Sequence, residues 1–364
     1  MNKITFMGAG STVFVRNVLG DCMCSDALKD WEYALYDIDA TRLEESFEII
    51  SAMNETKGGH ARITKHLGVE NRKEALRGAR FVVNAIQVGL YDPCTIIDFE
   101  VPKKYGLRQT IGDTLGIGGI MRALRTIPVM DDFARDMREV CPDALFLNYT
   151  NPMAMLSGYM QRYTGIETVG LCHSVQVCSE GLLKKLGMED KLEGRRELIE
   201  RYNIPLDEYP RRCVNQIAGW AKERDELKTG KHLDHQRTKE YASYIMESIV
   251  TNTPYEIGGN VLNKGGLIEN LPQDACVEVP CLVNGMGVHP CHVGRLPVQC
   301  AAMNMTNINV QLLTIEAAVT HKKEHIYQAA MLDPHTGSEL DMDTIVRMVD
   351  DLIETHGSWL PRYK

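Results

Sequence analysis

A cysteine and a histidine stand side by side at positions 172 and 173, directly after the apolar run Val169 to Leu171. A thiolate attacks a substrate only where a base and an oxyanion hole assist it. A thiolate, an imidazole and substrate oxygens can instead hold a divalent metal ion, and a cysteine can also fill a core. Side chains of adjacent residues point apart, so adjacency does not indicate a Cys172–His173 dyad. The residues leave these three roles open.

The second stretch that suggests chemistry is the glycine turn MGAGSTV, residues 7–13. Gly8 and Gly10 match the first two glycines of the dinucleotide-binding pattern, which permit a tight turn and close approach of a pyrophosphate, while Val13 holds the third position. Asp37 ends the next apolar run, where a carboxylate can accept hydrogen bonds from the adenosine ribose. A carboxylate would repel a 2′-phosphate, so the pattern favours NAD over NADP. The alternative is a purely structural turn in an α/β protein.

Polar side chains follow three later apolar runs of the chain. They are Gln87 after the run at 79–89, Asn148 and Asn151 in the run at 143–152, and Cys172 with His173 at the end of 167–172. A glycine-rich stretch at 110–128 carries Asp113, Arg122 and Arg125. In an open parallel sheet the loops at the carboxyl ends of the strands line one crevice. We therefore expect these loop tips to form an active site.

The elements that must position these residues alternate along the first half of the chain. Predicted strands lie at 4–7, 32–39, 79–89, 143–152 and 167–172, and an amphipathic helix is predicted over 40–53. Strands separated by helices imply parallel βαβ units. The predicted fold class is α/β, a Rossmann-like doubly wound parallel sheet with a mixed, mainly helical C-terminal region. A polar stretch at 184–197 suggests a boundary between an NAD-binding domain at 1–185 and a C-terminal domain at 186–364.

Composition excludes several classes of protein. The 364 residues carry a net charge of −9, whereas a nucleic-acid binder normally shows a basic face. No window approaches the roughly 18 apolar residues of a membrane span, and the N-terminus lacks a signal-peptide hydrophobic region. Eleven cysteines without a disulfide-like spacing fit reduced thiols. These features predict a cytoplasmic protein without nucleic-acid or membrane partners.

Seven motifs together resemble glycoside hydrolase family 4, the NAD-dependent glycosidases, over nearly the whole chain. They are ITFMGAGSTVFVRNVLGD (4–21), QTIGDTLGIGGIMRALRTIP (109–128), NYTNPMAM (148–155), GLCHSVQ (170–176), IERYNIPLDEYPRR (199–212), VEVPCLVNG (277–285) and TNINVQLLTIEAAV (306–319). The Cys-His-Ser motif is similar to that of the α-galactosidase branch. The resemblance implies a small α-galactoside substrate such as melibiose, and a homodimer or homotetramer.

The resemblance also implies an unusual mechanism, because this family is an exception to two-carboxylate glycosidase chemistry. Bound NAD⁺ takes a hydride from the sugar C3 hydroxyl, a base removes the acidified C2 proton, and the glycosidic bond breaks by elimination. Water then adds and the hydride returns. A divalent cation, usually Mn²⁺, acts as a Lewis acid on the C2 and C3 oxygens.

The family roles map onto individual positions of this sequence. Cys172 is the implied metal ligand, His173 stands where relatives carry a candidate proton donor, and Asn151 and Asp113 are the implied sugar contacts. The implied NAD-binding residues are Gly8, Gly10, Ser11, Thr12, Asp37 and Gln87. Oxidation of a thiolate ligand would release the metal, so the resemblance also predicts a need for reducing conditions.

The sequence departs from the family pattern after the Cys-His motif. Relatives carry there a long segment with an Asn-His dipeptide, whose histidine is the second metal ligand, and a tyrosine that acts as the C2 base. This chain passes directly into 184–203, which we expect to be one helix fused across a shortening near 188–196. We do not expect the missing roles to pass to His232, His235, His289 or His292, nor to Tyr202 or Tyr209.

The sequence leaves three alternatives to an α-galactosidase. One is a neighbouring specificity in the same family, α-galacturonidase or α-glucosidase. Another is a catalytically impaired protein that retains only its NAD-binding shell. The third is a 2-hydroxyacid dehydrogenase, which shares the N-terminal pattern but would produce NADH, whereas the family mechanism gives no net redox change.

Overall fold

The computed structural model describes residues 2–173, 206–228 and 234–364. The predicted domain boundary, the predicted fused helix at 184–203, His232, Tyr202 and Ser174 all lie outside the described residues. Among the described residues, no helix is both long and apolar enough to cross a membrane.

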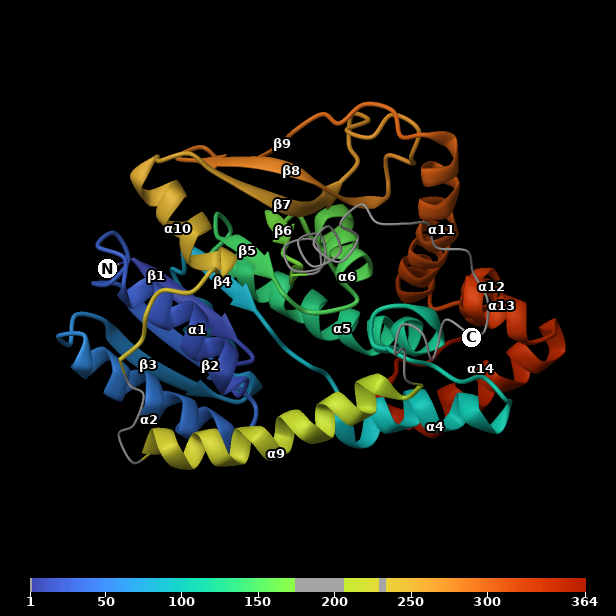
Figure 1. Cartoon of the computed structure of the whole chain (residues 1–364), viewed down its shortest axis with the longest axis horizontal. Coiled ribbons are helices and arrows are strands. Elements are labelled where there is room, and N and C mark those ends of the chain that lie inside the picture. Colours follow the sequence, from blue (N-terminus) through green and yellow to red (C-terminus); the bar gives the residue numbers. More distant parts are fainter. Residues whose placement is uncertain (1, 174–205, 229–233) are drawn as a thin grey trace, which may run out of the picture.

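One nine-stranded sheet forms the centre of the molecule (Figure 1). Its strands are β1 (Lys3–Met7), β2 (Glu32–Asp37), β3 (Arg62–Leu67), β4 (Phe81–Asn84), β5 (Leu145–Asn148), β6 (Thr168–Gly170), β7 (Tyr255–Leu262), β8 (Cys276–Asn284) and β9 (Gly287–Pro290). The order is β3-β2-β1-β4-β5-β6-β7-β8-β9. Neighbours from β3 to β6 are parallel, and β7, β8 and β9 add antiparallel strands at the β6 edge. The predicted doubly wound parallel sheet is confirmed, and C-terminal strands extend it.

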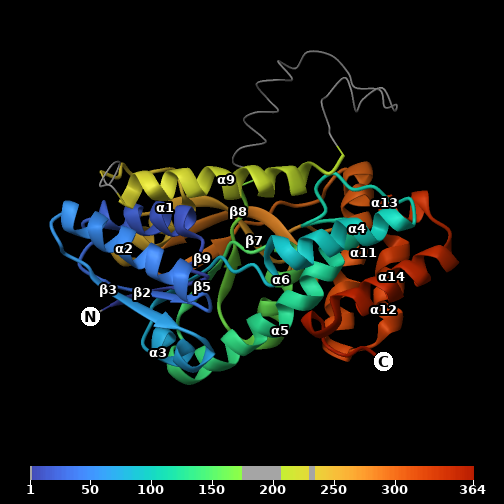
Figure 2. The ribbon, with the colours of Figure 1, turned by 90° about the horizontal axis from the view of Figure 1, so that it is seen from below.

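The helices cover both faces of the sheet. They are α1 (Thr12–Met23), α2 (Ala40–Thr56), α3 (Arg72–Leu76), α4 (Ile96–Lys104), α5 (Gly116–Val140), α6 (Met153–Tyr159), α9 (Glu208–Lys228), α10 (Tyr241–Thr251), α11 (Val298–Thr320), α12 (Lys323–Leu332), α13 (Pro334–Glu339) and α14 (Met342–His356). Short helical turns lie at η1 (Val69–Asn71), η2 (Leu90–Thr95), η3 (Met160–Thr164) and η4 (Gly357–Trp359). Figure 2 shows α1 and α2 on one side of the parallel strands and α3 and α5 on the other.

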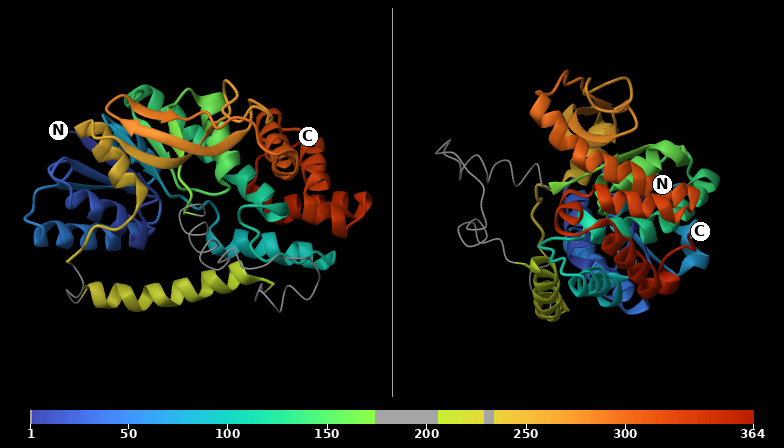
Figure 3. Two further views of the ribbon diagram at one scale, coloured as in Figure 1. Left: turned by 45° about the horizontal axis from the view of Figure 1, so that its top comes forward. Right: turned by 90° about the vertical axis from the view of Figure 1, so that its right-hand side faces the viewer.

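The C-terminal helices α11 to α14 gather at the end of the molecule opposite β1, β2 and β3 (Figures 1 and 3). Helix α9 runs along the outside, and its first turn is anchored on α4 by stacking of Tyr209 on Phe99, with ring centroids 6.5 Å apart. The C-terminal region is thus mainly helical with a few strands, as the sequence predicts.

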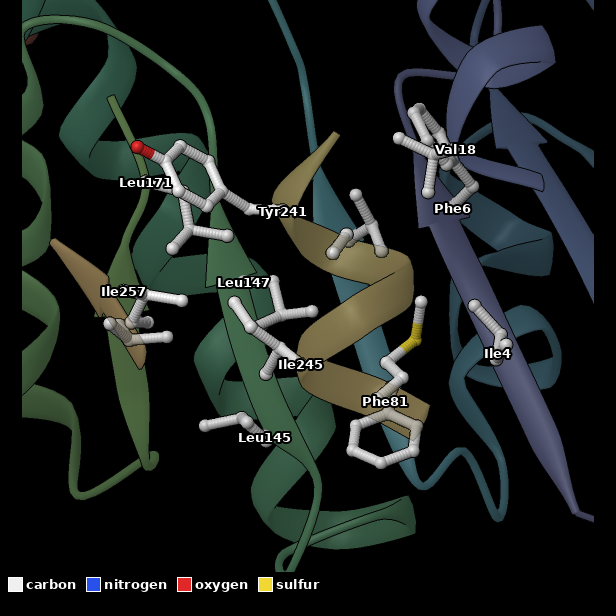
Figure 4. Close-up of a cluster of buried hydrophobic side chains, with 14 of the residues drawn as sticks. Ile4, Phe6, Val18, Phe81, Leu145, Leu147, Leu171, Tyr241, Ile245 and Ile257 are labelled. Carbon is white, nitrogen blue, oxygen red and sulfur yellow. The ribbon is translucent and has the colours of Figure 1, made fainter. Parts of the chain in front are cut away.

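Alternation along the strands produces two cores, one on each face of the sheet. In β5, Leu145 and Leu147 join the core that contains α1, α2 and α10, whereas Phe146 joins the core that contains α3, α5 and α14. Figure 4 shows the first core, with Tyr241 and Ile245 of α10 facing the strands. Successive strand side chains point to opposite faces, so a continuous apolar run serves both cores.

The predicted elements agree with the observed ones in position more closely than in length. The run at 79–89 contains β4, which ends at Asn84, and the run at 143–152 contains β5, which ends at Asn148. In both cases the last residues of the run form the loop at the carboxyl end. The polar edge strand β3, with the sequence RITKHL, is absent from the sequence-based prediction because it has no apolar periodicity and is largely exposed.

Truncation of Leu147, which is fully buried in β5, should lower the free energy of unfolding by about 2–5 kcal/mol, because the Leu147→Ala change removes apolar contacts and leaves a cavity. The control is Met303→Ala on α11, where the side chain is 70% exposed. Urea unfolding of both variants measures the difference. Equal losses in the two variants would contradict this account of the core.

Candidate functional site

The turn between β1 and α1 is held tightly against two neighbouring strands. The N–H groups of Gly8 and Ala9 donate to the carbonyl oxygen of Tyr36, at 3.0 and 2.9 Å. Gly8 has φ +87°, and a Cβ there would lie 2.9 Å from backbone atoms of Ala85 and Ile86. Glycine is therefore required at position 8 both by conformation and by close packing.

Asp37 lies beside this turn, at the carboxyl end of β2. Its Oδ2 accepts a hydrogen bond from the N–H of Gly10 at 2.6 Å, and its Oδ1 accepts one from the N–H of Asp39 at 2.9 Å. A Cβ on Gly10 would lie 2.9 Å from Asp37 Oδ2. The carboxylate is thus fixed next to the start of α1. Each oxygen retains a lone pair that could accept a hydrogen bond from a ribose hydroxyl.

The other predicted cofactor residues differ in what their side chains do. Ser11 is exposed at the N-terminus of α1, and its backbone carbonyl accepts the N–H groups of the first helical turn. The Thr12 hydroxyl is buried against the Ser46 hydroxyl at 2.9 Å, and Ser46 donates to the carbonyl of Ala9 at 2.6 Å. Thr12 therefore fastens α1 to α2 with its side chain. Gln87 is half-buried in the loop after β4.

A buried polar network joins the ends of β4 and β5. The Asn84 carboxamide donates to Oδ1 of Asn148 at 2.9 Å and to the hydroxyl of Thr150 at 3.1 Å. Thr150 in turn donates to the carbonyl of Ile86 at 3.1 Å. These bonds fix the loop that carries Asn151. The buried Oδ1 of Asn151 has no hydrogen-bond partner among the described residues, and such an atom usually has one.

Asp113 is buried in the loop before α5 and forms an ion pair. Its Oδ2 lies 3.4 Å from Nη1 of Arg122, which also donates to the Tyr209 hydroxyl oxygen at 2.9 Å. Burial raises the pKa of Tyr209 to about 12, although the Arg122 charge acts in the opposite direction. Tyr209 is therefore protonated near neutral pH and connects the first turn of α9 to Arg122.

His173, placed directly after β6, contacts a carboxylate that the sequence analysis did not identify. Its Nε2 lies 2.9 and 3.0 Å from the two carboxylate oxygens of Glu240, the residue that precedes α10. The hydrogen bond to Glu240 raises the pKa of His173 above its usual value, while burial opposes the shift. The Glu240 side chain is 8% exposed, whereas that of His173 is 47% exposed.

Three aromatic rings surround the imidazole of His173. Tyr149 stacks on it with centroids 5.8 Å apart, Phe14 meets it edge-on at 6.4 Å, and Tyr241 is tilted against it at 6.2 Å. Sequence reasoning missed Tyr149 and Tyr241 as well as Glu240, because they join the site only by folding. The one local signal is the polar sequence TKE (238–240) just before an amphipathic helix.

Cys172 is half-buried beside these residues, next to the end of β6. The Cys172 thiol and the Glu278 and Glu240 carboxylates all act electrostatically on Tyr241, whose pKa burial raises to about 12. Among the described residues, however, no group of three histidine, cysteine, aspartate or glutamate side chains could hold a metal ion.

The other described histidines that sequence analysis considered are bound elsewhere. His235 contacts the buried Asp21 at 2.6 Å, His289 contacts Asn284 at 3.1 Å and His292 lies 3.6 Å from Glu269. No disulfide joins the described cysteines.

The described ends of β1, β2, β4, β5 and β6 therefore bring together most of the predicted site. Gly8, Gly10 and Asp37 form a dinucleotide-type turn, and Asn151, Cys172 and His173 lie on the loops after β5 and β6. Asp113 lies in the loop before α5 and is held there by its ion pair with Arg122 of α5.

Comparison with known proteins identifies relatives of the whole chain. An α-galactosidase of Bacillus subtilis (strain 168) is 50% identical, and the match covers all of both chains. That alignment runs over 436 positions, whereas this chain has 364 residues. At least 72 positions of the alignment therefore have no residue in this chain.

Two solved structures share the fold. A 6-phospho-α-glucosidase from gut microorganisms, in complex with NAD and glucose-6-phosphate, has a TM-score of 0.80 at 20% identity, covering 100% of this chain and 99% of its own. The 6-phospho-β-glucosidase of Thermotoga maritima, with manganese, NAD⁺ and glucose-6-phosphate, has a TM-score of 0.78 at 18% identity, covering 99% of this chain and 100% of its own.

Two family models also match. The model for family 4 glycosyl hydrolases matches residues 3–188, and the model for the C-terminal domain of that family matches residues 142–336. With a match over more than half its length and a full-length relative at 50% identity, the chain belongs to family 4 of the glycosyl hydrolases.

Proposed function

We propose that the chain is an NAD- and divalent-metal-dependent α-galactosidase that hydrolyses small α-galactosides such as melibiose. The observation that carries this proposal is the 50% identity to the Bacillus subtilis α-galactosidase over the full length of both proteins. We further propose that it works in the cytoplasm as a homodimer or homotetramer.

The described residues fit NAD. The glycine turn is tight, because a side chain at Gly8 would collide with the backbone of the β4 loop and one at Gly10 with Asp37, and Asp37 offers lone pairs beside the N-terminus of α1. When bound, NAD supplies an acceptor for a hydride from the sugar. The residues of the turn hold the dinucleotide, and the Asp37 carboxylate disfavours a cofactor with a 2′-phosphate.

On the sugar side, three positions act in different ways. Asn151 offers a buried carboxamide oxygen that can accept a hydrogen bond from a sugar hydroxyl. Asp113 is held by Arg122 and can accept another, because a carboxylate has more lone pairs than this ion pair uses. His173 can give a proton to the glycosidic oxygen that leaves.

The metal site is less complete than the NAD site. We propose Cys172 as one ligand, but the described residues add no group of three ligands around it. We therefore assign no catalytic step to the metal ion from these residues. The remaining ligands would come from outside the described ranges or from a second subunit.

Purified chain under reducing conditions should hydrolyse p-nitrophenyl α-galactoside only when both NAD⁺ and Mn²⁺ are present. Release of p-nitrophenol, followed with each cofactor added and omitted in turn, measures this dependence. The corresponding β-galactoside, α-glucoside and α-galacturonide test specificity, and a preference for one of them would contradict the α-galactoside proposal.

A second candidate function is an NAD-binding protein with impaired chemistry. It is favoured by the absence of a three-ligand cluster among the described residues and by the 72 or more aligned positions that the chain lacks. This candidate predicts that NAD binds while no glycoside is hydrolysed under any of these conditions.

Replacement of Asp37 by alanine should weaken NAD binding roughly ten- to a hundredfold, because hydrogen bonds to a charged group are lost. The variant should also discriminate less between NAD and NADP, because the repulsion of the 2′-phosphate disappears. Isothermal titration calorimetry measures both affinities.

The matched control for this change is Asp341→Ala. Like Asp37, Asp341 accepts a backbone N–H with its carboxylate, in its case from Thr344 in the first turn of α14. The control should keep wild-type NAD affinity, and an unchanged affinity in Asp37→Ala would contradict the assignment.

A further inference from the structure

The imidazole of His173 has one nitrogen engaged and one available. Nε2 lies within hydrogen-bond distance of both Glu240 oxygens, at 2.9 and 3.0 Å. No described residue forms a hydrogen bond with Nδ1. Because a carboxylate only accepts, Glu240 holds the proton of the neutral ring on Nε2.

Glu240 is itself fixed from several sides. Its Oε1 accepts the N–H of Tyr241 at 3.1 Å, and its own N–H donates to the Thr238 hydroxyl at 3.1 Å. Thr238 donates to Oδ2 of the fully buried Asp21 on α1 at 2.6 Å, and Oδ1 of Asp21 accepts the N–H of Thr238 at 2.8 Å. A chain of hydrogen bonds thus runs from Asp21 on α1 through Thr238 to the backbone N–H of Glu240.

The aromatic rings define the plane of the imidazole. Tyr149, stacked on His173, accepts the N–H of Ala242 at 2.9 Å through its hydroxyl oxygen and forms a side-chain hydrogen bond with Glu240. Phe14 packs against Tyr149 with centroids 4.6 Å apart. Rotation of the His173 ring would break the Nε2 contact with Glu240 and the stacking on Tyr149 together.

We propose that Glu240 is a positioning residue for His173, and that it turns Nδ1 of His173 toward the leaving glycosidic oxygen. The inference rests on the proposed function and adds to it a residue and a reacting atom. Two observations support it. The buried, oriented carboxylate of Glu240 contacts Nε2 of His173, and no described residue forms a hydrogen bond with Nδ1.

His173 gives up and regains one proton in each turnover. The imidazolium carries protons on both nitrogens, and the Nδ1 proton passes to the glycosidic oxygen as the bond from C1 to that oxygen breaks and the oxygen keeps the electron pair. The electrons of the C2–H bond, whose proton the C2 base has removed, form the C1=C2 double bond. The ring is left neutral with its proton on Nε2, against Glu240. The water that adds at C1 gives its hydroxyl to the sugar and its proton to Nδ1, which restores the imidazolium.

The first test compares two leaving groups in the variant Glu240→Gln. The sugar that leaves from melibiose needs a proton, whereas p-nitrophenolate is stable as an anion. We expect kcat/KM to fall roughly ten- to a hundredfold for melibiose and by less than about threefold for p-nitrophenyl α-galactoside. In a His173→Gln background, Glu240→Gln should cause no further loss on melibiose, because it acts through His173.

The control is Glu247→Gln on α10, the helix that Glu240 precedes. Glu247 pairs with Arg237 at 2.7 Å and accepts from Ser25 at 2.6 Å, away from His173. This variant should treat both substrates like the wild type. Equal losses on the two substrates in Glu240→Gln, or a further loss in the His173→Gln background, would overturn the proposal.

The second test does not depend on turnover. Nitrogen NMR of the full chain with ¹⁵N-labelled histidine, with the His173 signal assigned by its loss in His173→Gln, reports which nitrogen of the neutral ring carries the proton. We expect Nε2–H in the wild type and a mixture of tautomers in Glu240→Gln. A proton on Nδ1 in the wild type would overturn the role of Glu240. If Nε2 carries the proton but the chain hydrolyses no glycoside, the role of Glu240 stands and the proposed α-galactosidase function is rejected instead.

Discussion

The hydrogen bond from the buried Asn84 carboxamide to Asn148 couples the ends of β4 and β5, two neighbouring strands of the parallel sheet. Both side chains are fully buried, so their polar atoms have no access to solvent. Nδ2 of Asn84 donates to Asn148 and to Thr150, whereas Oδ1 of Asn84 has no hydrogen-bond partner among the described residues. A buried polar group without a partner costs free energy. These hydrogen bonds therefore favour this one arrangement of the two strand ends over alternatives that would break them. The loop that carries Asn151 begins at the end of β5. Cys172 and His173 come directly after β6, the next strand in the sheet.

One half of the site is formed by strand pairing in the sheet, and the other half is formed by the packing of a helix. Gly8, Gly10 and Asp37 are brought together by the parallel pairing of β1 with β2 and β4, in which Met7 lies opposite Tyr36 and Asn84. His173 instead meets Glu240 only because α10 packs against β7, β8 and α1. The dinucleotide half therefore depends on strand register, and the His173 half depends on the position of one helix.

The family membership and the described site differ in one respect. The fold, the glycine turn and the order of the motifs along the chain agree with family 4, while at least 72 positions of the Bacillus subtilis alignment have no residue here. His173 is paired with Glu240, whose carboxylate also accepts the N–H of Tyr241, yet the described residues around Cys172 do not form a metal cluster. The glycine turn and Cys172 lie at the ends of different strands, β1 and β6.

The sequence by itself determined the parallel α/β sheet, the glycine turn with Asp37, and the family. These are local or periodic signals: apolar runs of strand length, a glycine that needs φ +87°, and contiguous motifs. Only the tertiary structure decided that Glu240, 67 residues after His173, is the partner of its Nε2, that Tyr209 of α9 binds Arg122, and that Thr12 uses its hydroxyl on Ser46. Such contacts join residues that are far apart in the chain, and they depend on how the helices pack on the sheet. That packing cannot be predicted from residue types or from their spacing along the sequence.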